Sequence, residues 1–232
     1  MSRLSWIGPS SSERNRLLDI GAGAGYFTFN ATKSGWVAEG IEPDAKARER
    51  AMAKFGLTLH RGSLEDAPFA KNAVDVVTMW DLIEHVENPR DTLAKAHQIL
   101  TDGGRVIITT ANIESWDFGS SPKTWDMLFS GHLFYFTPST LRRLLTSTGF
   151  SDITISDSRE VDRPPTPAYA GTYGLESLTL TSALQAFLKR PAHLLKIPAA
   201  IRRKLQFAVF RLRYPRHYDM PIMLVSARKR RL

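Results

Sequence analysis

Cysteine is absent from the 232 residues of this chain, and its absence excludes disulfide bonds, thiolate metal sites and cysteine nucleophiles. The chain also lacks any uninterrupted run of 18 apolar residues, which a membrane-spanning helix would need. Residues 1–16 contain no apolar stretch long enough for a signal peptide. We therefore expect a cytoplasmic protein, and the composition of its last residues leaves a peripheral position at the inner membrane surface open.

Acidic residues are scarce near the C-terminal end. Residues 189–232 hold 13 of the 31 lysines and arginines, and Asp219 is the only acidic residue among them. Between about residues 194 and 216, apolar side chains recur every three or four positions beside basic ones, which predicts an amphipathic helix. Such a helix can lie on an anionic membrane surface, or its apolar face can pack on the main domain. Nucleic acid is a less favoured partner, because no RNA-binding module is recognisable and aromatic residues do not alternate with the basic ones.

Strand-like and helix-like segments alternate along most of the chain. The predicted strands are residues 16–20, 35–41, 57–61, 74–80, 105–110, 152–156 and 220–227. The predicted helices between them are residues 26–34, 43–55, 89–100 and 137–149. Such alternation predicts an α/β fold, in which helices cover both faces of a mainly parallel sheet.

Three prolines within residues 163–167 end this alternation, because proline disrupts helices and strand pairing alike. Residues 175–214 then favour helix before the final strand. We therefore expect a single domain over residues 1–232, with a basic helical insertion at about 163–218 ahead of the last strand.

A glycine-rich loop follows the first predicted strand, in the segment LLDIGAGAGYF. Gly21, Gly23 and Gly25 let the backbone turn sharply and let a ligand approach closely. A dinucleotide-binding fingerprint would have glycine at the position of Tyr26, and the lysine of a phosphate-binding loop is also missing. Asp19, two residues before the first glycine, can hold the loop or the ammonium group of a ligand.

Glu42 ends the second predicted strand and is followed by Pro43. A carboxylate at the end of this strand can accept hydrogen bonds from both hydroxyls of a ribose. The alternative is that Glu42 only favours the start of the next helix.

Four segments in this order resemble the class I S-adenosylmethionine-dependent methyltransferases: LLDIGAGAGYF, GIEPD, VVTMWDLIEHVENP and ILTDGGRVIITTAN. Within that class the chain most resembles the branch of the ubiquinone-biosynthesis O-methyltransferases and many sugar-modifying enzymes. The resemblance implies a Rossmann-like methyltransferase fold with a seven-stranded sheet whose last strand is antiparallel. It also implies S-adenosylmethionine as cofactor, and methyl transfer to oxygen of a small-molecule, sugar or lipid-linked acceptor.

The same resemblance implies positions for the parts of the cofactor. The methionine part lies against the loop, the ribose against the end of the second strand, the adenine after the third strand, and the methionine end and the acceptor beyond the fourth. The residues concerned are, in that order, Asp19, Gly21, Gly23, Gly25 and Tyr26; Glu42 and Pro43; Ser63 and Leu64; Trp80 and Asp81. Ser63 stands where the family often has an acidic residue.

Methyl transfer needs no metal ion, and we assign no metal ligands from the sequence. Loss of a proton from an acceptor hydroxyl would be helped by a base, for which histidine suits neutral pH. His132 is the first candidate and His85 a weaker one, and for both the alternative is a structural imidazole. The aromatic residues within 113–136 favour a lid over the acceptor. Two further readings stay open, an RNA methyltransferase and a non-catalytic protein that binds the cofactor.

Overall fold

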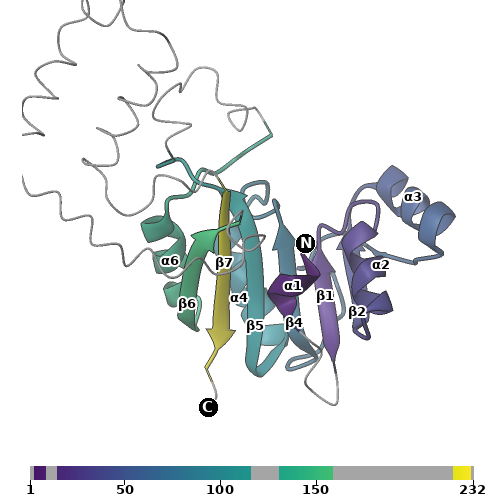
Figure 1. Cartoon of the computed structure of the whole chain (residues 1–232), viewed down its shortest axis with the longest axis horizontal. Helices are drawn as coiled ribbons and strands as arrows, with labels where there is room; N and C mark the ends of the chain where they lie inside the picture. The colour runs from purple at the N-terminus through teal and green to yellow at the C-terminus, as the bar shows by residue number, and fades with distance from the viewer. Residues whose placement is uncertain (1–2, 9–14, 116–130, 159–221, 231–232) are drawn as a thin grey trace, which may run out of the picture.

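The computed structural model describes residues 3–8, 15–115, 131–158 and 222–230 (Figure 1). Seven strands in these ranges form one sheet in the order β3-β2-β1-β4-β5-β7-β6. The strands are β1 Arg16–Ile20, β2 Val37–Glu42, β3 His60–Arg61, β4 Val74–Trp80, β5 Leu100–Ala111, β6 Phe150–Asp157 and β7 Ile222–Lys229. The first five are mutually parallel, and β7 runs antiparallel between β5 and β6. The predicted α/β fold with a mainly parallel seven-stranded sheet is thus confirmed.

Helices lie on both faces of this sheet (Figure 1). They are α1 Leu4–Ile7, α2 Tyr26–Lys33, α3 Ala45–Phe55, α4 Pro89–Ile99 and α6 Pro138–Ser147. Buried side chains of α1 and α2 pack on one face of the sheet, and those of α4 and α6 pack on the other. Asn88 and Thr137 cap the N-termini of α4 and α6 by accepting backbone N–H groups, as their position before a proline predicted.

Most element bounds differ from the prediction by one to five residues, and for two of them the contacts give the reason. Strand β5 begins at Leu100 rather than at residue 105, because Leu100 already pairs with Val74 before the register shifts at an irregularity. Helix α3 begins at Ala45 rather than at Pro43, because the side chain of Asp44 accepts the Ala47 N–H and acts as the N-cap.

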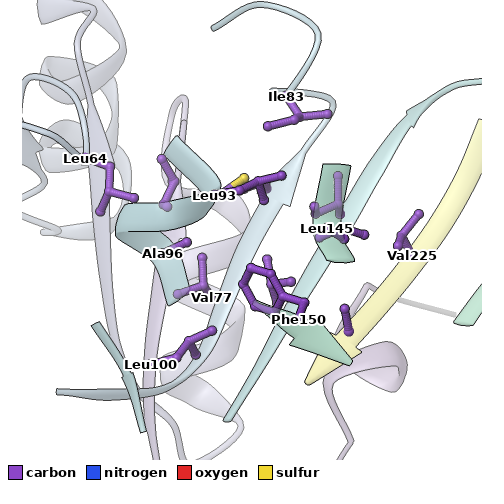
Figure 2. Packing of buried hydrophobic residues seen from close by; sticks show 14 of the residues in the cluster. Leu64, Val77, Ile83, Leu93, Ala96, Leu100, Leu145, Phe150 and Val225 are labelled. Atoms are coloured by element: carbon purple, nitrogen blue, oxygen red, sulfur yellow. The ribbon is translucent and has the colours of Figure 1, made fainter. Parts of the chain in front are cut away.

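The larger apolar core lies between the sheet and the helices α4 and α6 (Figure 2). Leu93 and Ala96 of α4 contact this core, and Val77 of β4 and Val225 of β7 reach it from the sheet. Leu145 of α6 belongs to the same core. Because all these side chains are buried and apolar, they hold the strands at fixed positions and so fix the edge of the sheet at which the parallel strands end.

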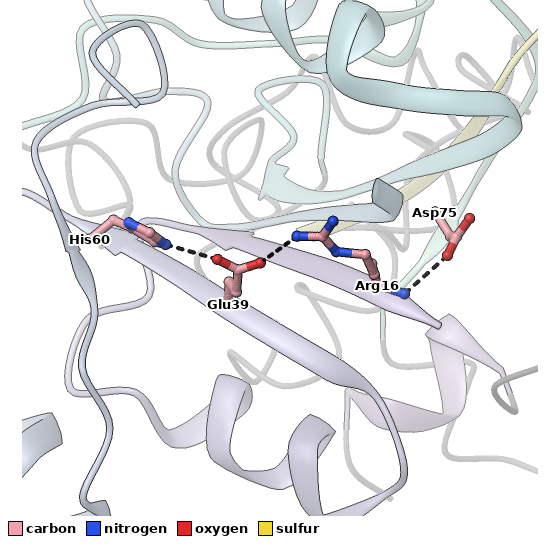
Figure 3. A network of polar contacts seen from close by, with 4 residues as sticks. All are labelled: Arg16, Glu39, His60 and Asp75. Carbon is pink, nitrogen blue, oxygen red and sulfur yellow. Dashed lines mark hydrogen bonds and ion pairs between the residues drawn. The ribbon is translucent and has the colours of Figure 1, made fainter. Parts of the chain in front are cut away.

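A polar network ties the first strands together on the sheet (Figure 3). The carboxylate of Glu39 accepts a hydrogen bond from the Arg16 guanidinium at 2.9 Å and contacts His60 Nε2 at 2.9 Å. The Arg16 backbone N–H donates to the carboxylate of Asp75 at 3.0 Å. These contacts join β1, β2, β3 and β4, and they hold the pKa of Glu39 below its usual value although partial burial opposes this. The network stabilises the register of the parallel strands.

Some predictions fall on residues outside the described ranges. They are the helical insertion at about 163–218, the amphipathic segment at about 194–216, and most of the predicted lid, from residue 116 to residue 130. Within the described residues, no helix combines the length and the apolar character that crossing a membrane requires.

We predict that Leu93→Ala destabilises the protein by about 2–5 kcal/mol, because it leaves a cavity in the core between α4 and the sheet. Urea denaturation followed by circular dichroism measures the free energy of unfolding. Met52→Ala on α3 is the control, since Met52 is largely exposed and its truncation should change stability by less than about 0.5 kcal/mol. Equal effects of both changes would contradict this description of the core.

Candidate functional site

The glycine-rich loop connects β1 to α2 at the carboxyl edge of the sheet. Gly21, Gly23 and Gly25 all have positive φ angles, of 69°, 55° and 76°, which residues with a Cβ rarely adopt. A Cβ on Gly21 would lie 2.8 Å from Cδ1 of Leu82, whereas a Cβ on Gly23 would meet no atom within 4 Å. A Cβ on Gly21 would therefore displace the Leu82 side chain, whereas Gly23 faces open space that a ligand can use.

Glu42 holds this loop in place. One carboxylate oxygen accepts the Gly23 N–H at 2.7 Å, and the other accepts the Asp44 N–H at 2.9 Å. The backbone carbonyl of Ile41 accepts the N–H groups of Gly21 and Ala22, each at 2.9 Å. The end of β2 thus fixes the loop and the start of α3 together. The two readings of Glu42, as a ligand-binding group and as a structural one, are compatible with this geometry.

A pocket of about 600 Å³ opens beside the loop. Its lining comes from the ends of β1 and β2 and from the segments after β3 and β4: Ile20, Gly21, Ile41, Pro43, Gly62, Ser63, Leu64, Glu65, Leu82, His85, Val86, Glu87, Asn88, Asp91 and Thr92. The pocket therefore contains Gly21, Pro43, Ser63 and Leu64 of the predicted cofactor residues. The Ser63 hydroxyl donates to the carboxylate of Asp66 at 2.8 Å.

Asp19 lies beneath the loop and is 1% exposed. Its two carboxylate oxygens accept hydrogen bonds from the hydroxyls of Thr28, at 2.9 Å, and Thr78, at 2.8 Å. Burial raises the pKa of Asp19 to about 7, although the two hydroxyl hydrogen bonds act in the opposite direction. The positive charge of Arg3 also lowers this pKa, and the negative charge of Glu42 raises it. Asp19 is thus held in place by hydrogen bonds at a site where its charge is costly.

Asp81 directly follows β4 and has a positive φ of 53°, a strained conformation that aspartate tolerates better than most residues. Its carboxylate accepts hydrogen bonds from the Arg3 guanidinium at 2.9 Å and the Thr109 hydroxyl at 2.8 Å. The Arg3 guanidinium also lies over the ring of Trp80, 5.0 Å from its centre. Residues before α1 and after β4 therefore meet at this edge of the sheet.

Trp80 and Tyr26 do not line the pocket. Trp80 is buried on the face of the sheet that α1 and α2 cover, where its ring contacts those of Trp6 and Phe27. The side chain of Tyr26 is 52% exposed and packs edge-on against Phe55 of α3. These contacts give both side chains a packing role, and the predicted places of Tyr26 at the methionine part and of Trp80 at the methionine end and the acceptor stay predictions.

The two candidate histidines lie together. The rings of His85 and His132 are in edge-to-face contact, with their centres 4.7 Å apart. His85 follows β4 and lines the pocket, whereas His132 belongs to the segment before α6. Glu84 joins them, since one potential metal-ligand atom from each of the three residues lies within 4.8 Å of the others. These three residues could bind an acceptor hydroxyl or a cation.

Several residues of the site escaped the sequence analysis. Leu82 packs against Gly21, Arg3 reaches Asp81 across 78 positions of the sequence, and Glu84 is buried beside the two histidines. Asn88 and Asp91, at the start of α4, also line the pocket. The segment DLIEHVENP contained three of these five residues, and a carboxylate next to histidine was the signal that could have singled out Glu84.

Comparisons with known proteins agree with this geometry. A family model for the methyltransferase domain matches residues 2–155. The chain is 29% identical over 170 residues to the ubiquinone biosynthesis O-methyltransferase of Aeromonas salmonicida, a match covering 63% of this chain and 68% of that protein. It is 31% identical over 117 residues to the protein of the same name from Aromatoleum aromaticum, covering 47% of this chain and only half of that relative's length.

Solved structures share the fold. A SAM-dependent methyltransferase from Archaeoglobus fulgidus superposes with a TM-score of 0.62 at 18% identity, covering 98% of this chain and 91% of that one. The phosphoethanolamine N-methyltransferase 2 of Haemonchus contortus, solved with S-adenosyl-L-methionine, gives a TM-score of 0.58 at 18% identity and covers 98% and 51%. At these identities the likeness establishes the arrangement of helices and strands and not the acceptor.

We predict that the free energy of unfolding decreases as the pH rises from about 4 to about 7, and that it decreases less in Asp19→Asn. The pKa of Asp19 is raised from 3.8 to about 7 on folding, so the folded protein keeps a proton that the unfolded chain has lost. The stabilisation is fully present below pH 3.8 and is lost as the pH rises through about 7. Urea denaturation of both proteins at pH 5, 6, 7 and 8 gives this difference. Parallel pH dependences would contradict it.

Proposed function

This chain belongs to the methyltransferase-domain family and uses S-adenosylmethionine, and from that premise we propose that it transfers a methyl group to an oxygen atom of a small-molecule, sugar or lipid-linked acceptor. The observation that carries the proposal is the hydrogen bond from the Gly23 N–H to the carboxylate of Glu42, whose neighbours Ile41 and Pro43 line the pocket. The choice of oxygen rests on the likeness to relatives named O-methyltransferases and on the imidazoles at the acceptor end.

The adenosine part of the cofactor binds along the pocket in this proposal. The carboxylate of Glu42 takes the ribose hydroxyls, and the space above Gly23 admits the cofactor without a Cβ in the way. Ser63 and Leu64 border the adenine, where the backbone N–H of Leu64 can donate to a ring nitrogen and the Ser63 hydroxyl oxygen can accept from the amino group. The apolar walls of Ile20, Leu64 and Leu82 suit a planar ring.

The methionine part of the cofactor carries both an ammonium and a carboxylate group. Asp81 and Arg3 present the two complementary charges side by side, at the edge of the sheet where β4 ends. Asp81 would bind the ammonium group and Arg3 the carboxylate, in place of the contact that they make with each other. Asp19, buried beneath the loop, accepts hydrogen bonds from the hydroxyls of Thr28 and Thr78 and so holds α2 and β4 together below the loop.

Methyl transfer is an in-line displacement with a sulfonium leaving group, so the protein mainly needs to align the acceptor oxygen with the methyl carbon and to exclude water. The acceptor hydroxyl binds at Glu84, His85 and His132 in this proposal. His132 assists loss of the acceptor's proton, and His85 is fixed by a 2.8 Å hydrogen bond between its Nδ1 and the Gly131 carbonyl oxygen. Leu133 and Phe134 are exposed beside them and offer an apolar surface to the rest of the acceptor.

A lipid-linked acceptor is the variant that the basic segment at about 194–216 favours, because a helix on an anionic membrane surface would bring the site close to such a substrate. This segment lies outside the described residues, and membrane binding stays a prediction from the sequence.

We predict that Glu42→Gln raises the Kd for S-adenosylhomocysteine at least about tenfold, because a neutral amide accepts weaker hydrogen bonds than a carboxylate. Isothermal titration calorimetry measures the affinity. Glu39→Gln is the matched control, since Glu39 lies on the same strand but contacts Arg16 and His60 instead of the loop (Figure 3). If Glu42→Gln binds as tightly as Glu39→Gln, the placement of the ribose is wrong.

We predict that His132→Ala lowers turnover by roughly 10²–10⁴-fold and leaves the affinity for S-adenosylhomocysteine unchanged. The acceptor is first found by release of S-adenosylhomocysteine over a panel of phenols, sugars and lipid-linked alcohols. His60→Ala, which alters an imidazole of β3 outside the site, provides the comparison. A loss of less than tenfold in His132→Ala would return His132 to a structural role.

A further inference from the structure

The turn after β3 carries a serine whose hydroxyl hydrogen has a fixed partner. The Ser63 hydroxyl donates to the carboxylate of Asp66 at 2.8 Å, and the Ser63 backbone N–H donates to the same oxygen at 3.3 Å. These hydrogen bonds hold the pKa of Asp66 below its usual value, so its carboxylate is ionised at neutral pH and can only accept. Because a serine hydroxyl has one hydrogen and Asp66 takes it, the Ser63 oxygen has only lone pairs left for a ligand.

The residues around this pair keep Asp66 close to Ser63. Gly62 has a φ of 107°, which residues with a Cβ rarely adopt, and a Cβ at this position would lie only 3.3 Å from Oδ2 of Asp66. On the other side of Ser63, the side chain of Leu64 is buried in the larger apolar core and anchors the turn (Figure 2). The chain therefore fixes the Ser63–Asp66 pair from both sides.

Ser63 lines the pocket, whereas Asp66 does not. Leu64 also contributes to the lining, and the apolar side chains of Ile41 and Leu82 form walls of the same pocket. A ligand at this end of the pocket meets the Ser63 hydroxyl oxygen as an acceptor and, one residue further along the chain, the Leu64 backbone N–H as a donor. Asp66 can therefore act on such a ligand only through the Ser63 hydroxyl.

An acceptor beside a donor matches one edge of adenine and mismatches the same edge of hypoxanthine. Adenine presents its 6-amino group as a donor and its N1 as an acceptor. In hypoxanthine the 6-oxo oxygen accepts and the N1–H donates, so both contacts would face groups of their own kind and lose their hydrogen bonds, which lowers affinity. A serine hydroxyl that was free to rotate would discriminate less, because it could turn and donate to the oxo group.

We propose that Asp66 fixes the Ser63 hydroxyl as a hydrogen-bond acceptor, and that the site thereby selects a 6-aminopurine nucleoside over its 6-oxo counterpart. Ser63 is the residue that contacts the base, and Asp66 is a positioning residue that acts through it. The two side chains together supply the acceptor that a single acidic side chain at the place of Ser63 would supply alone. This inference rests on the proposed function, because it takes the ligand to be the adenosine part of the cofactor.

Isothermal titration calorimetry of the full chain with S-adenosylhomocysteine and with S-inosylhomocysteine, which differ only in the purine, tests the proposal. We expect the wild-type protein to bind the adenosyl compound at least about tenfold more tightly. Asp66→Ala frees the hydroxyl to donate, so this variant should bind S-inosylhomocysteine more tightly than the wild type does. Ser63→Ala removes the acceptor and should instead weaken S-adenosylhomocysteine binding. Each change should reduce the preference at least about threefold.

Asp152→Ala is the matched control, since Asp152 is an exposed acid on β6, at the opposite edge of the sheet from β3. Ser63→Asp combined with Asp66→Ala should restore the preference, because a carboxylate at position 63 can only accept. If the wild type binds S-adenosylhomocysteine without this preference, if Asp66→Ala keeps the preference unchanged, or if the double variant fails to restore it, the role of Asp66 is overturned and the proposed function stands. If the wild type binds neither compound, the proposed function itself is overturned.

Discussion

The carboxylate of Glu42 makes the contacts on which the arrangement of the site depends. It joins Gly23 of the loop after β1 to the backbone before α3, and the neighbouring carbonyl of Ile41 takes two further N–H groups of the loop. The loop has three residues with positive φ and so gains little from regular secondary structure. Hydrogen bonds from the end of β2 therefore decide where the loop's open side faces.

The positions of the other site residues also depend on where the strands of the sheet end. Parallel strands place all their carboxyl ends at one edge, so the residues after β1, β2, β3 and β4 meet there whatever their separation in the sequence. The core between the sheet and the helices α4 and α6 keeps these ends in register (Figure 2). The polar network of Arg16, Glu39, His60 and Asp75 helps to hold the same four strands together (Figure 3).

The segment after β4 serves both halves of the proposed reaction. Leu82 packs against the glycine-rich loop, while His85 lines the pocket and reaches the segment before α6. Asp81 faces the other way, towards Arg3. A single short segment therefore connects the cofactor side to the acceptor side. Asp81 in this segment has a strained positive φ and Glu84 has a buried carboxylate, and both features are common at functional sites.

Local patterns were enough to predict most of the fold. The strands β1 and β4 have the predicted bounds, and the caps Asn88 and Thr137 begin the helices that they were expected to begin. Two of the exceptions have local causes as well, since Asp44 caps α3 two residues after its predicted start and an irregularity lets β5 start early. Runs of β-branched residues and the helical spacing of apolar residues are patterns within a few neighbouring residues, so strands and helices can be recognised from them without the tertiary structure.

The sequence by itself determined the order of the elements, the glycine-rich loop and the resemblance to S-adenosylmethionine-dependent methyltransferases. Only the tertiary structure decided that Glu42 holds Gly23, that Arg3 meets Asp81, and that Glu84 lies beside His132. The tertiary structure also shows that the ring of Tyr26 packs against Phe55 and that of Trp80 against Trp6, and neither residue lines the pocket. These contacts join residues with no periodic relation in the chain, so they follow from the packing of strands and helices and not from any local pattern.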